Sequence, residues 1–277
     1  MSDKASPFTL ALLAGGCAGT TVDVSLHPLD TIRTRIQSQD GFWKAGGFKG
    51  VYRGILAATL GSAPGAAFFF STYETMKKVI KGASGGSEHW THHSAASSCG
   101  EVAACLVRVP TAVVTQNMQV GHYGSFTEAV STTYRTSGLR GFYAGYGTTV
   151  FREIPFAFIQ FPIYEAFKKT WASIQGSETT PTQGAMCGSV AGAIAGGLTT
   201  PLDVAKTRIV LEQSGKGVAK RYTGTINTLS LIAKEEGVLG LFKGVGPRVT
   251  WITIGGFIFF GAYEKSTEMM WRTTLWD

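Results

Sequence analysis

Residues 27–37 read HPLDTIRTRIQ, and this pattern occurs twice more in the chain. Residues 109–119 read VPTAVVTQNMQ, and residues 200–210 read TPLDVAKTRIV. The prolines of successive copies are 82 and 91 residues apart. A motif that recurs at a nearly even spacing indicates internal repeats, each of which folds as one supersecondary unit.

Two further landmarks follow each copy in the same order. The first is an aromatic- or aliphatic-rich tetrapeptide ending in glycine: VYRG at 51–54, FYAG at 142–145 and LFKG at 241–244. The second contains an acidic residue after tyrosine, in STYETMKK, PIYEAFKK and GAYEKSTE. We therefore predict three repeats, 1–85, 86–178 and 179–277, that together form one domain.

Each repeat is predicted to contain two long helices joined by a short polar segment with a short helix. The first helices of the repeats are expected at 8–37, 92–120 and 183–212, and the second at 52–81, 143–172 and 243–271. About 28 helical residues span about 42 Å, enough to cross a bilayer with tilt. A proline inside such a helix bends it, which membrane helices tolerate. The sequence predicts an all-α membrane protein with six transmembrane helices, in three pseudo-threefold repeats around a central cavity.

Composition agrees with a membrane protein. Only 16% of residues are charged, against about a quarter in soluble domains, and 36 glycines suit helices packed closely in lipid. The net charge of +7 favours contact with anionic lipid headgroups, because no aromatic and basic surface for nucleic acid is apparent. No nucleophile–base pair, metal-ligand cluster or dinucleotide fingerprint occurs, so we expect no catalysis, metal or cofactor.

The three-fold pattern resembles the signature of the mitochondrial carrier family. The first copy matches Pro-x-acid-x-x-base-x-base-x-Gln throughout, and the second helices match aromatic-acid-x-x-base at Tyr73 and Tyr164. The resemblance implies alternating access across the mitochondrial inner membrane. It also implies one ring of ion pairs on the matrix side, from Asp30, Arg33, Gln37, Asp203 and Lys206, and a cytoplasmic ring from Glu74, Lys77, Glu165, Lys168 and Glu264.

The second repeat departs from the matrix-side pattern. By the pairing that the resemblance implies, Asp203 meets Arg33, but Asp30 faces Thr115 and Lys206 faces Ala112. On the cytoplasmic side Glu74 pairs with Lys168 and Glu264 with Lys77, whereas Glu165 meets Thr267. We predict a matrix gate weaker than the cytoplasmic gate.

Charged and aromatic residues elsewhere in the spans are candidates for substrate binding, because a charge at mid-membrane costs roughly 2.5–3.5 kcal/mol. They are Asp23, Glu101, Arg108, Arg152, Glu153 and Trp251. An arginine can hold a carboxylate, the acids can hold cations, and Trp251 offers a ring face to a base or a cation. Glu101 and Arg108, seven residues apart on one helix face, could equally bridge each other, and Arg152 and Glu153 could simply neutralise a neighbouring helix.

Within the family, GEVAACLVRVP, VFREIPFAFIQFP and TIGGFIFFGAYE resemble carriers of S-adenosylmethionine. This implies import of S-adenosylmethionine in exchange for S-adenosylhomocysteine, with membrane lipid such as cardiolipin as a further partner and a monomer as the expected state. A carrier of another cationic amino acid or nucleotide derivative is the main alternative, and an uncoupling leak on the same fold is another.

Overall fold

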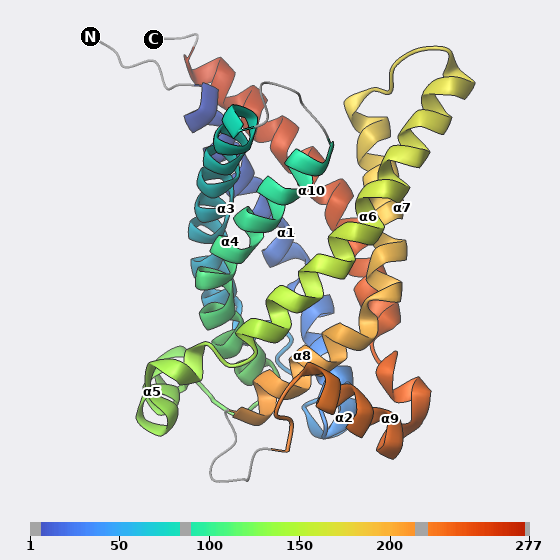
Figure 1. Ribbon diagram of the computed structural model, residues 1–277. Helices are drawn as coiled ribbons and strands as arrows, with labels where there is room; N and C mark the ends of the chain where they lie inside the picture. The colour runs from blue at the N-terminus through green and yellow to red at the C-terminus, as the bar shows by residue number, and fades with distance from the viewer. Residues whose placement is uncertain (1–6, 84–89, 214–220, 275–277) are drawn as a thin grey trace.

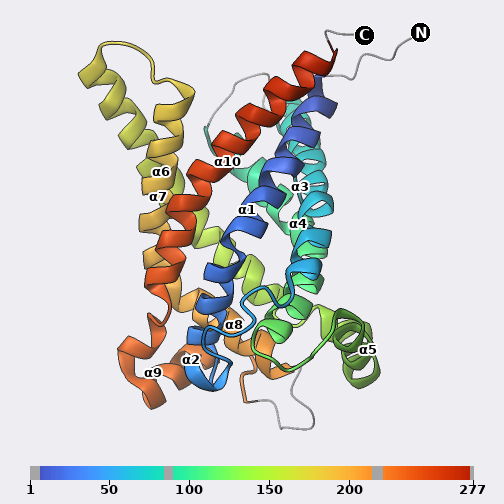
Figure 2. The same cartoon turned by 180° about the vertical axis from the view of Figure 1, so that it is seen from behind.

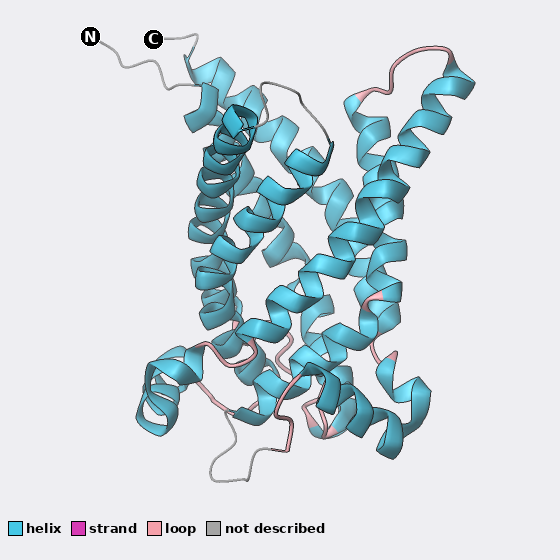
Figure 3. Cartoon of the chain, viewed as in Figure 1, coloured by secondary structure: helices cyan, strands magenta, loops and turns pink. Residues whose placement is uncertain are grey.

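A computed structural model describes residues 7–83, 90–213 and 221–274, and every regular element among them is a helix (Figures 1 and 3). The long helices are α1 (Pro7–Gln37), α3 (Ile55–Ala83), α4 (Trp90–Gln119), α6 (Tyr146–Gln175), α7 (Pro181–Leu198) with α8 (Thr200–Gln213), and α10 (Val245–Thr274). The short helices between them are α2 (Gly41–Lys44), α5 (Phe126–Phe142) and α9 (Thr225–Leu241). The predicted all-helical carrier architecture is confirmed.

The long helices form a closed ring. Each packs against the next in the order α1, α3, α4, α6, α7 and α10, and α10 packs against α1 to complete it. The short helices and α8 gather at one end of the ring, and α1 begins and α10 ends at the other (Figures 1 and 2). We call these the closed end and the open end, because the hairpin of α6 and α7 diverges from the other helices only where α1 begins and α10 ends.

Composition alone identifies only some of the spans. Among the described residues, Ile55–Gly82 and Ala95–Gln119 each contain a stretch long and apolar enough to cross a membrane, and the pair Thr182–Leu198 and Thr200–Glu212 is a third, bent candidate. The other long helices carry charged residues such as Asp23, Arg152 and Arg248 within their length. Side chains that face a polar interior lower the apolar character of a helix without preventing it from spanning.

The first helix of the third repeat is broken rather than continuous. The prediction placed one kinked helix at 183–212, but the chain bends by 65° between α7 and α8. Thr199 and Thr200 lie at the break, and their hydroxyl groups donate to the carbonyls of Ala195 and Gly196 at 2.7 and 2.8 Å. Such bonds compete with the helical ladder and bend helices. In α1 and α4 the helix continues through the corresponding proline.

One glycine in each repeat makes the junction between the closed end and the second long helix. Gly54, Gly145 and Gly244 end the repeated tetrapeptides, and their φ angles are 85°, 75° and 78°. This left-handed conformation is strained for other residues. A Cβ atom would also lie 2.9 Å from the Thr115 carbonyl oxygen at Gly54 and 2.9 Å from Val210 at Gly145. The glycines therefore allow each repeat to approach the next one closely.

Candidate functional site

A cavity of about 1140 Å³ occupies the centre of the ring. Its lining includes Lys168 and Thr179 near the open end and Asp30 and Thr115 near the closed end, so it follows the ring for much of its depth. Ligand sites for drug-sized molecules are typically 300–1,000 Å³. The cavity therefore has room for a nucleoside-sized solute together with water.

The charged lining contains three carboxylates and two cations: Asp23, Asp30, Glu101, Arg108 and Lys168. The side chains of Arg108 and Glu101 form an ion pair along one face of α4. This is the bridging arrangement that the sequence left open beside direct ligand contact. Asp23 interacts with the side chain of Ser62, and no described ion pair involves it. Asp23 therefore presents a carboxylate to the cavity without a close counterion.

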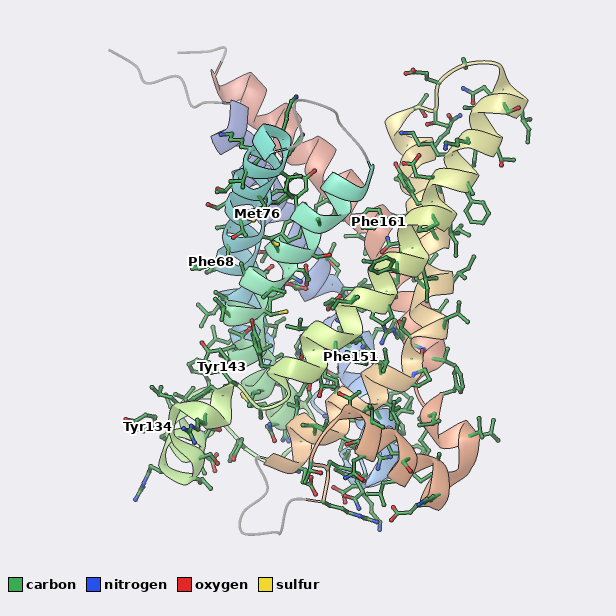
Figure 4. All side chains as sticks on the ribbon, viewed as in Figure 1. Phe68, Met76, Tyr134, Tyr143, Phe151 and Phe161 are labelled. Carbon is green, nitrogen blue, oxygen red and sulfur yellow. The ribbon has the colours of Figure 1, made fainter. Side chains whose placement is uncertain are left out.

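The second helices of all three repeats contribute aromatic side chains to the cavity. They are Phe69, Phe70, Phe156, Phe161, Tyr164, Trp251 and Phe259. Phe161 projects from α6 on the side toward α4, whereas Phe68, which is 48% exposed, lies on the outer side of α3 (Figure 4). The predicted candidate Trp251 thus lies among several ring faces that can stack on a planar base or attract a cation.

Asp203 is the centre of the closed end, together with Arg33, Gln37, Arg152 and Arg248; we call these five residues the Asp203 cluster. Arg33 Nε donates to Asp203 Oδ2 at 3.0 Å, and Gln37 Nε2 donates to the same oxygen at 2.9 Å. Arg248 Nη1 lies 2.8 Å and Arg152 Nε 3.8 Å from Asp203 Oδ1. The pair with Arg248 is an ion contact whose angles fall outside those of a hydrogen bond. Guanidinium groups from all three repeats thus meet one carboxylate.

The other carboxylate of the closed-end motif has weaker partners. Asp30 is 31% exposed, accepts a hydrogen bond from Gln119 Nε2 at 2.9 Å, and lies 3.6 Å from Arg33. Gln119 belongs to the second repeat, which has Thr115 where the motif has a base. An amide therefore makes the contact to Asp30 that a cation would have made.

The adjacent residues Arg152 and Glu153 form an ion pair with each other at the closed end, and the cavity lining includes neither. Arg152 also belongs to the Asp203 cluster, so it is one of the ion-paired cations of the closed end. Lys206 is close enough to Arg152, Asp203 and Glu153 to interact electrostatically, but no ion pair to it is found among the described residues. Asp23, Glu101, Arg108 and Trp251 thus line the cavity, and Arg152 and Glu153 do not, although Glu101 lies within electrostatic range of both.

The charged residues of the predicted cytoplasmic ring lie toward the open end. Among the side chains that the structure describes, no ion pair joins Glu74, Lys77, Glu165 or Lys168 to one another, and Lys168 Nζ lies 5.9 Å from the centre of the Tyr164 ring. Glu264 and Thr267 belong to the part of α10 for which only the backbone is described. Among the described side chains, ion pairs are therefore formed at the closed end and not among these four residues.

A second layer of buried charge lies between the Asp203 cluster and the short helices. Arg35 Nε donates to the Gln119 carbonyl at 2.8 Å, and Arg208 Nε donates to the Gln37 carbonyl at 2.5 Å, so each arginine joins two repeats. Arg208 also lies 2.8 Å from Glu236 on α9. Burial alone would raise the pKa of Glu236, but the hydrogen bond from Lys243 and the charge of Arg208 outweigh it and lower that pKa.

Arg248 is the residue of this site that the sequence analysis missed. It is 1% exposed, and its Nη2 donates to Thr199 Oγ1 at 3.0 Å, directly at the break between α7 and α8. Ala58 and Thr149 occupy the matching places in the other repeats, four residues after the junction glycine. The sequence does contain a feature that points to Arg248: an arginine inside a membrane span needs a counterion, and the motif carboxylates are the expected ones.

A cavity inside a ring of membrane helices, sealed at one end by charges from three sequence repeats, defines a solute carrier. The profile of the mitochondrial carrier protein family matches the chain three times, at residues 4–84, 86–174 and 177–274. The chain therefore belongs to the mitochondrial carrier family and is a multi-pass protein of the mitochondrial inner membrane.

Several relatives share nearly the whole length of the chain. It is 48% identical to the mitochondrial S-adenosylmethionine carrier protein of Xenopus tropicalis, over 96% of this chain and 97% of that protein. It is 49% identical to the protein of the same name from Danio rerio, over 93% and 96%. It is 47% identical to the S-adenosylmethionine mitochondrial carrier protein homolog of Drosophila melanogaster, over 96% and 95%.

Proposed function

We propose that this carrier imports S-adenosylmethionine into the mitochondrial matrix in exchange for S-adenosylhomocysteine. The supporting observation is a cavity that combines a carboxylate without an ion-pair partner among the described residues, several aromatic faces and a cation-rich closed end. The chain is also nearly half identical to proteins named for this substrate. S-adenosylmethionine carries a sulfonium and an ammonium, one carboxylate and an adenine base. Its charge pattern is complementary to that of the cavity.

Asp23 is the residue proposed to select the sulfonium. Its carboxylate faces the cavity from α1, and no described residue forms an ion pair with it. Removal of the methyl group leaves S-adenosylhomocysteine without the sulfonium charge, so Asp23 would favour the methylated solute. The aromatic lining around Trp251 supplies faces for the adenine and for cation–π attraction.

Arg152 and Glu153 are proposed to hold the amino-acid end, with Arg152 on the carboxylate and Glu153 on the ammonium. In the present state they form an ion pair with each other, and Arg152 also lies 3.8 Å from Asp203. A bound zwitterion supplies each of them with a new partner of the required sign, so the buried charges stay paired while the substrate is bound.

In this proposal the closed end faces the matrix and the open end the cytosol, so the structure corresponds to the state that receives substrate from outside. The gates are the Asp203 cluster with Asp30 and Lys206 at the matrix side, and the four separated charges with Glu264 at the cytosolic side. One chain completes the ring, which supports a monomer as the transporting unit. The basic net charge suits an anionic lipid such as cardiolipin at the surface.

Thermal unfolding of the detergent-purified protein against a panel of solutes tests the substrate. A ligand that binds only the folded state raises the melting temperature by mass action. We expect both S-adenosyl compounds to raise it, and ATP and lysine to leave it unchanged. Exchange of labelled S-adenosylmethionine for internal S-adenosylhomocysteine in proteoliposomes then tests transport.

Stabilisation by a different cationic amino acid or nucleotide derivative alone would refute the proposed substrate and leave the family assignment intact. Uptake into empty liposomes at the same rate as into loaded ones would refute the exchange, though not the substrate.

A further inference from the structure

The closed end of the cavity has one more positive charge than its carboxylates can neutralise. The cations are Arg33, Arg152, Arg248 and Lys206, and the carboxylates beside them are Asp30, Asp203 and Glu153. Glu101 also lies within electrostatic range of Arg152 and Lys206, but it forms its ion pair with Arg108, so that pair leaves the balance unchanged. A buried charge without a counterion is costly, and a native structure normally supplies one. One cation therefore has no carboxylate of its own in the part of the chain that the structure describes, and the carboxylate of the proposed substrate is a group of the sign that this cation lacks.

Lys206 is the cation without an ion-pair partner among the described residues. Its motif partner on α4, the helix that packs against α8, would be residue 112, and that residue is Ala112. Ala112 lines the cavity, as do Thr115 and Gln116 one turn further along α4. The position of the missing motif carboxylate is therefore open to the cavity, whereas Lys206 lies behind the lining and is not part of it.

Arg152 provides a second open donor nearby. Its Nε atom is buried without a hydrogen-bond partner among the described groups, and Lys206 lies within electrostatic range of it. Two neighbouring cations repel each other, and here one of them also has an N–H group without an acceptor in the described part of the chain. An anion bound between them would relieve both deficits.

We infer that Lys206 is a substrate-binding residue, which acts with Arg152 to hold the carboxylate of the transported solute in the place of the motif carboxylate absent at position 112. This inference rests on the proposed function and extends it, because it gives a residue of the closed-end motif a role in specificity. A carboxylate bound there gives Lys206 a partner of opposite charge, while Asp203 keeps its contacts with Arg33 and Arg248.

The test uses two substitutions that each restore one missing ion pair of the motif. Ala112→Asp gives Lys206 an internal partner, and Thr115→Lys gives Asp30 one. Only Ala112→Asp removes Lys206 from the substrate. Both variants and the wild-type protein are titrated with S-adenosylmethionine and with its decarboxylated analogue, and dissociation constants are taken from the concentration dependence of the melting temperature.

We expect the wild-type protein to prefer S-adenosylmethionine over the decarboxylated analogue by roughly 10-fold to 100-fold, the range for a charge-assisted contact. The preference should fall about ten-fold in Ala112→Asp and persist in Thr115→Lys. A Lys206→Met variant should lose the preference to the same extent as Ala112→Asp.

Equal preference in Ala112→Asp and Thr115→Lys would overturn the role of Lys206 while the proposed substrate stands. A wild-type protein that binds neither compound would remove the proposed function and this inference with it. Weaker binding of both compounds by the same factor in Ala112→Asp would also count against the inference, since a purely structural effect does not discriminate between them.

Discussion

Replacement of Asp203 by asparagine should destabilise the closed end more than any other change of a single charge. Asp203 is 2% exposed and touches guanidinium groups of Arg33, Arg152 and Arg248. An amide keeps the shape of the side chain but removes the only negative charge that these cations share. Breaking a buried ion pair from one side costs about 3–5 kcal/mol, because the remaining charge is left buried and unpaired.

A cost of this size should lower the melting temperature by roughly 6–20 °C, at about 2–4 °C per kcal/mol for a chain of this order of length. The measurement is thermal unfolding of detergent-purified protein at one fixed heating rate. Asp30→Asn is the matched control, because Asp30 is 31% exposed and its nearest partners are the Gln119 amide and Arg33 at 3.6 Å. Exposed pairs contribute about 0–1 kcal/mol, so the control should shift little.

Equal melting temperatures for the two variants would refute the reasoning. That result would mean that water or the other carboxylates already neutralise the three guanidinium groups, and that Asp203 is not the centre of the closed end. A large decrease in the melting temperature of both variants would instead show that Asp30 stabilises the closed end as much as Asp203 does.

Three other substitutions test separate parts of the structure. Asp23→Asn should abolish stabilisation by S-adenosylmethionine and retain stabilisation by S-adenosylhomocysteine. Titration of the melting temperature with each compound measures this, and equal losses for both compounds would show that the sulfonium assignment is wrong. Gly145→Ala should cost about 1–3 kcal/mol, because φ is 75° there, whereas Gly147→Ala, in a helical and open position, should be neutral or slightly stabilising; thermal unfolding compares them. Glu236→Gln should cost about 3 kcal/mol at neutral pH, since it leaves Arg208 buried and unpaired. The pKa of Glu236 is lowered below its usual 4.5, so its contribution is complete above pH 4.5 and is lost as pH falls through the lowered value; the wild-type and variant stabilities should therefore converge only in acid.

The fold could be predicted because repetition is recorded in residue types. A motif proline, a junction glycine and a tyrosine–acid pair recur in each repeat, and each has a local physical role. The φ angles of Gly54, Gly145 and Gly244 confirm that the repeated glycine marks one backbone conformation. The break at Thr199 was not predicted. Two adjacent threonines donate there to carbonyls four residues earlier, and the matching positions of the other repeats carry no threonine pair.

The site could be predicted less completely than the fold, because the choice of ion-pair partners depends on which helices face each other. The pairing implied by the family resemblance predicted the contact between Arg33 and Asp203, and the structure forms it. The motif did not predict that Arg152 and Arg248 contact the same carboxylate. Arg152 was assigned to the substrate, and Arg248 lies outside the repeated motifs. Periodicity did predict that Glu101 and Arg108 share a face of α4, but it could not decide between a bridge and a ligand contact, and the present state has the bridge.

Asp203 has more cationic partners than it needs, so the substrate can bind one of them without leaving the Asp203 carboxylate unpaired. If a substrate carboxylate takes Arg152, Asp203 still has Arg33 and Arg248, and both of its oxygens keep a donor or a cation. With a single partner, as in the bare motif, the same exchange would leave a buried carboxylate alone at a cost of several kcal/mol. The loss of both motif charges in the second repeat therefore does not simply weaken the closed end. It concentrates the pairing on one carboxylate from the third repeat, next to the residues proposed to hold the substrate, so that binding and the sealing of the cavity depend on the same guanidinium.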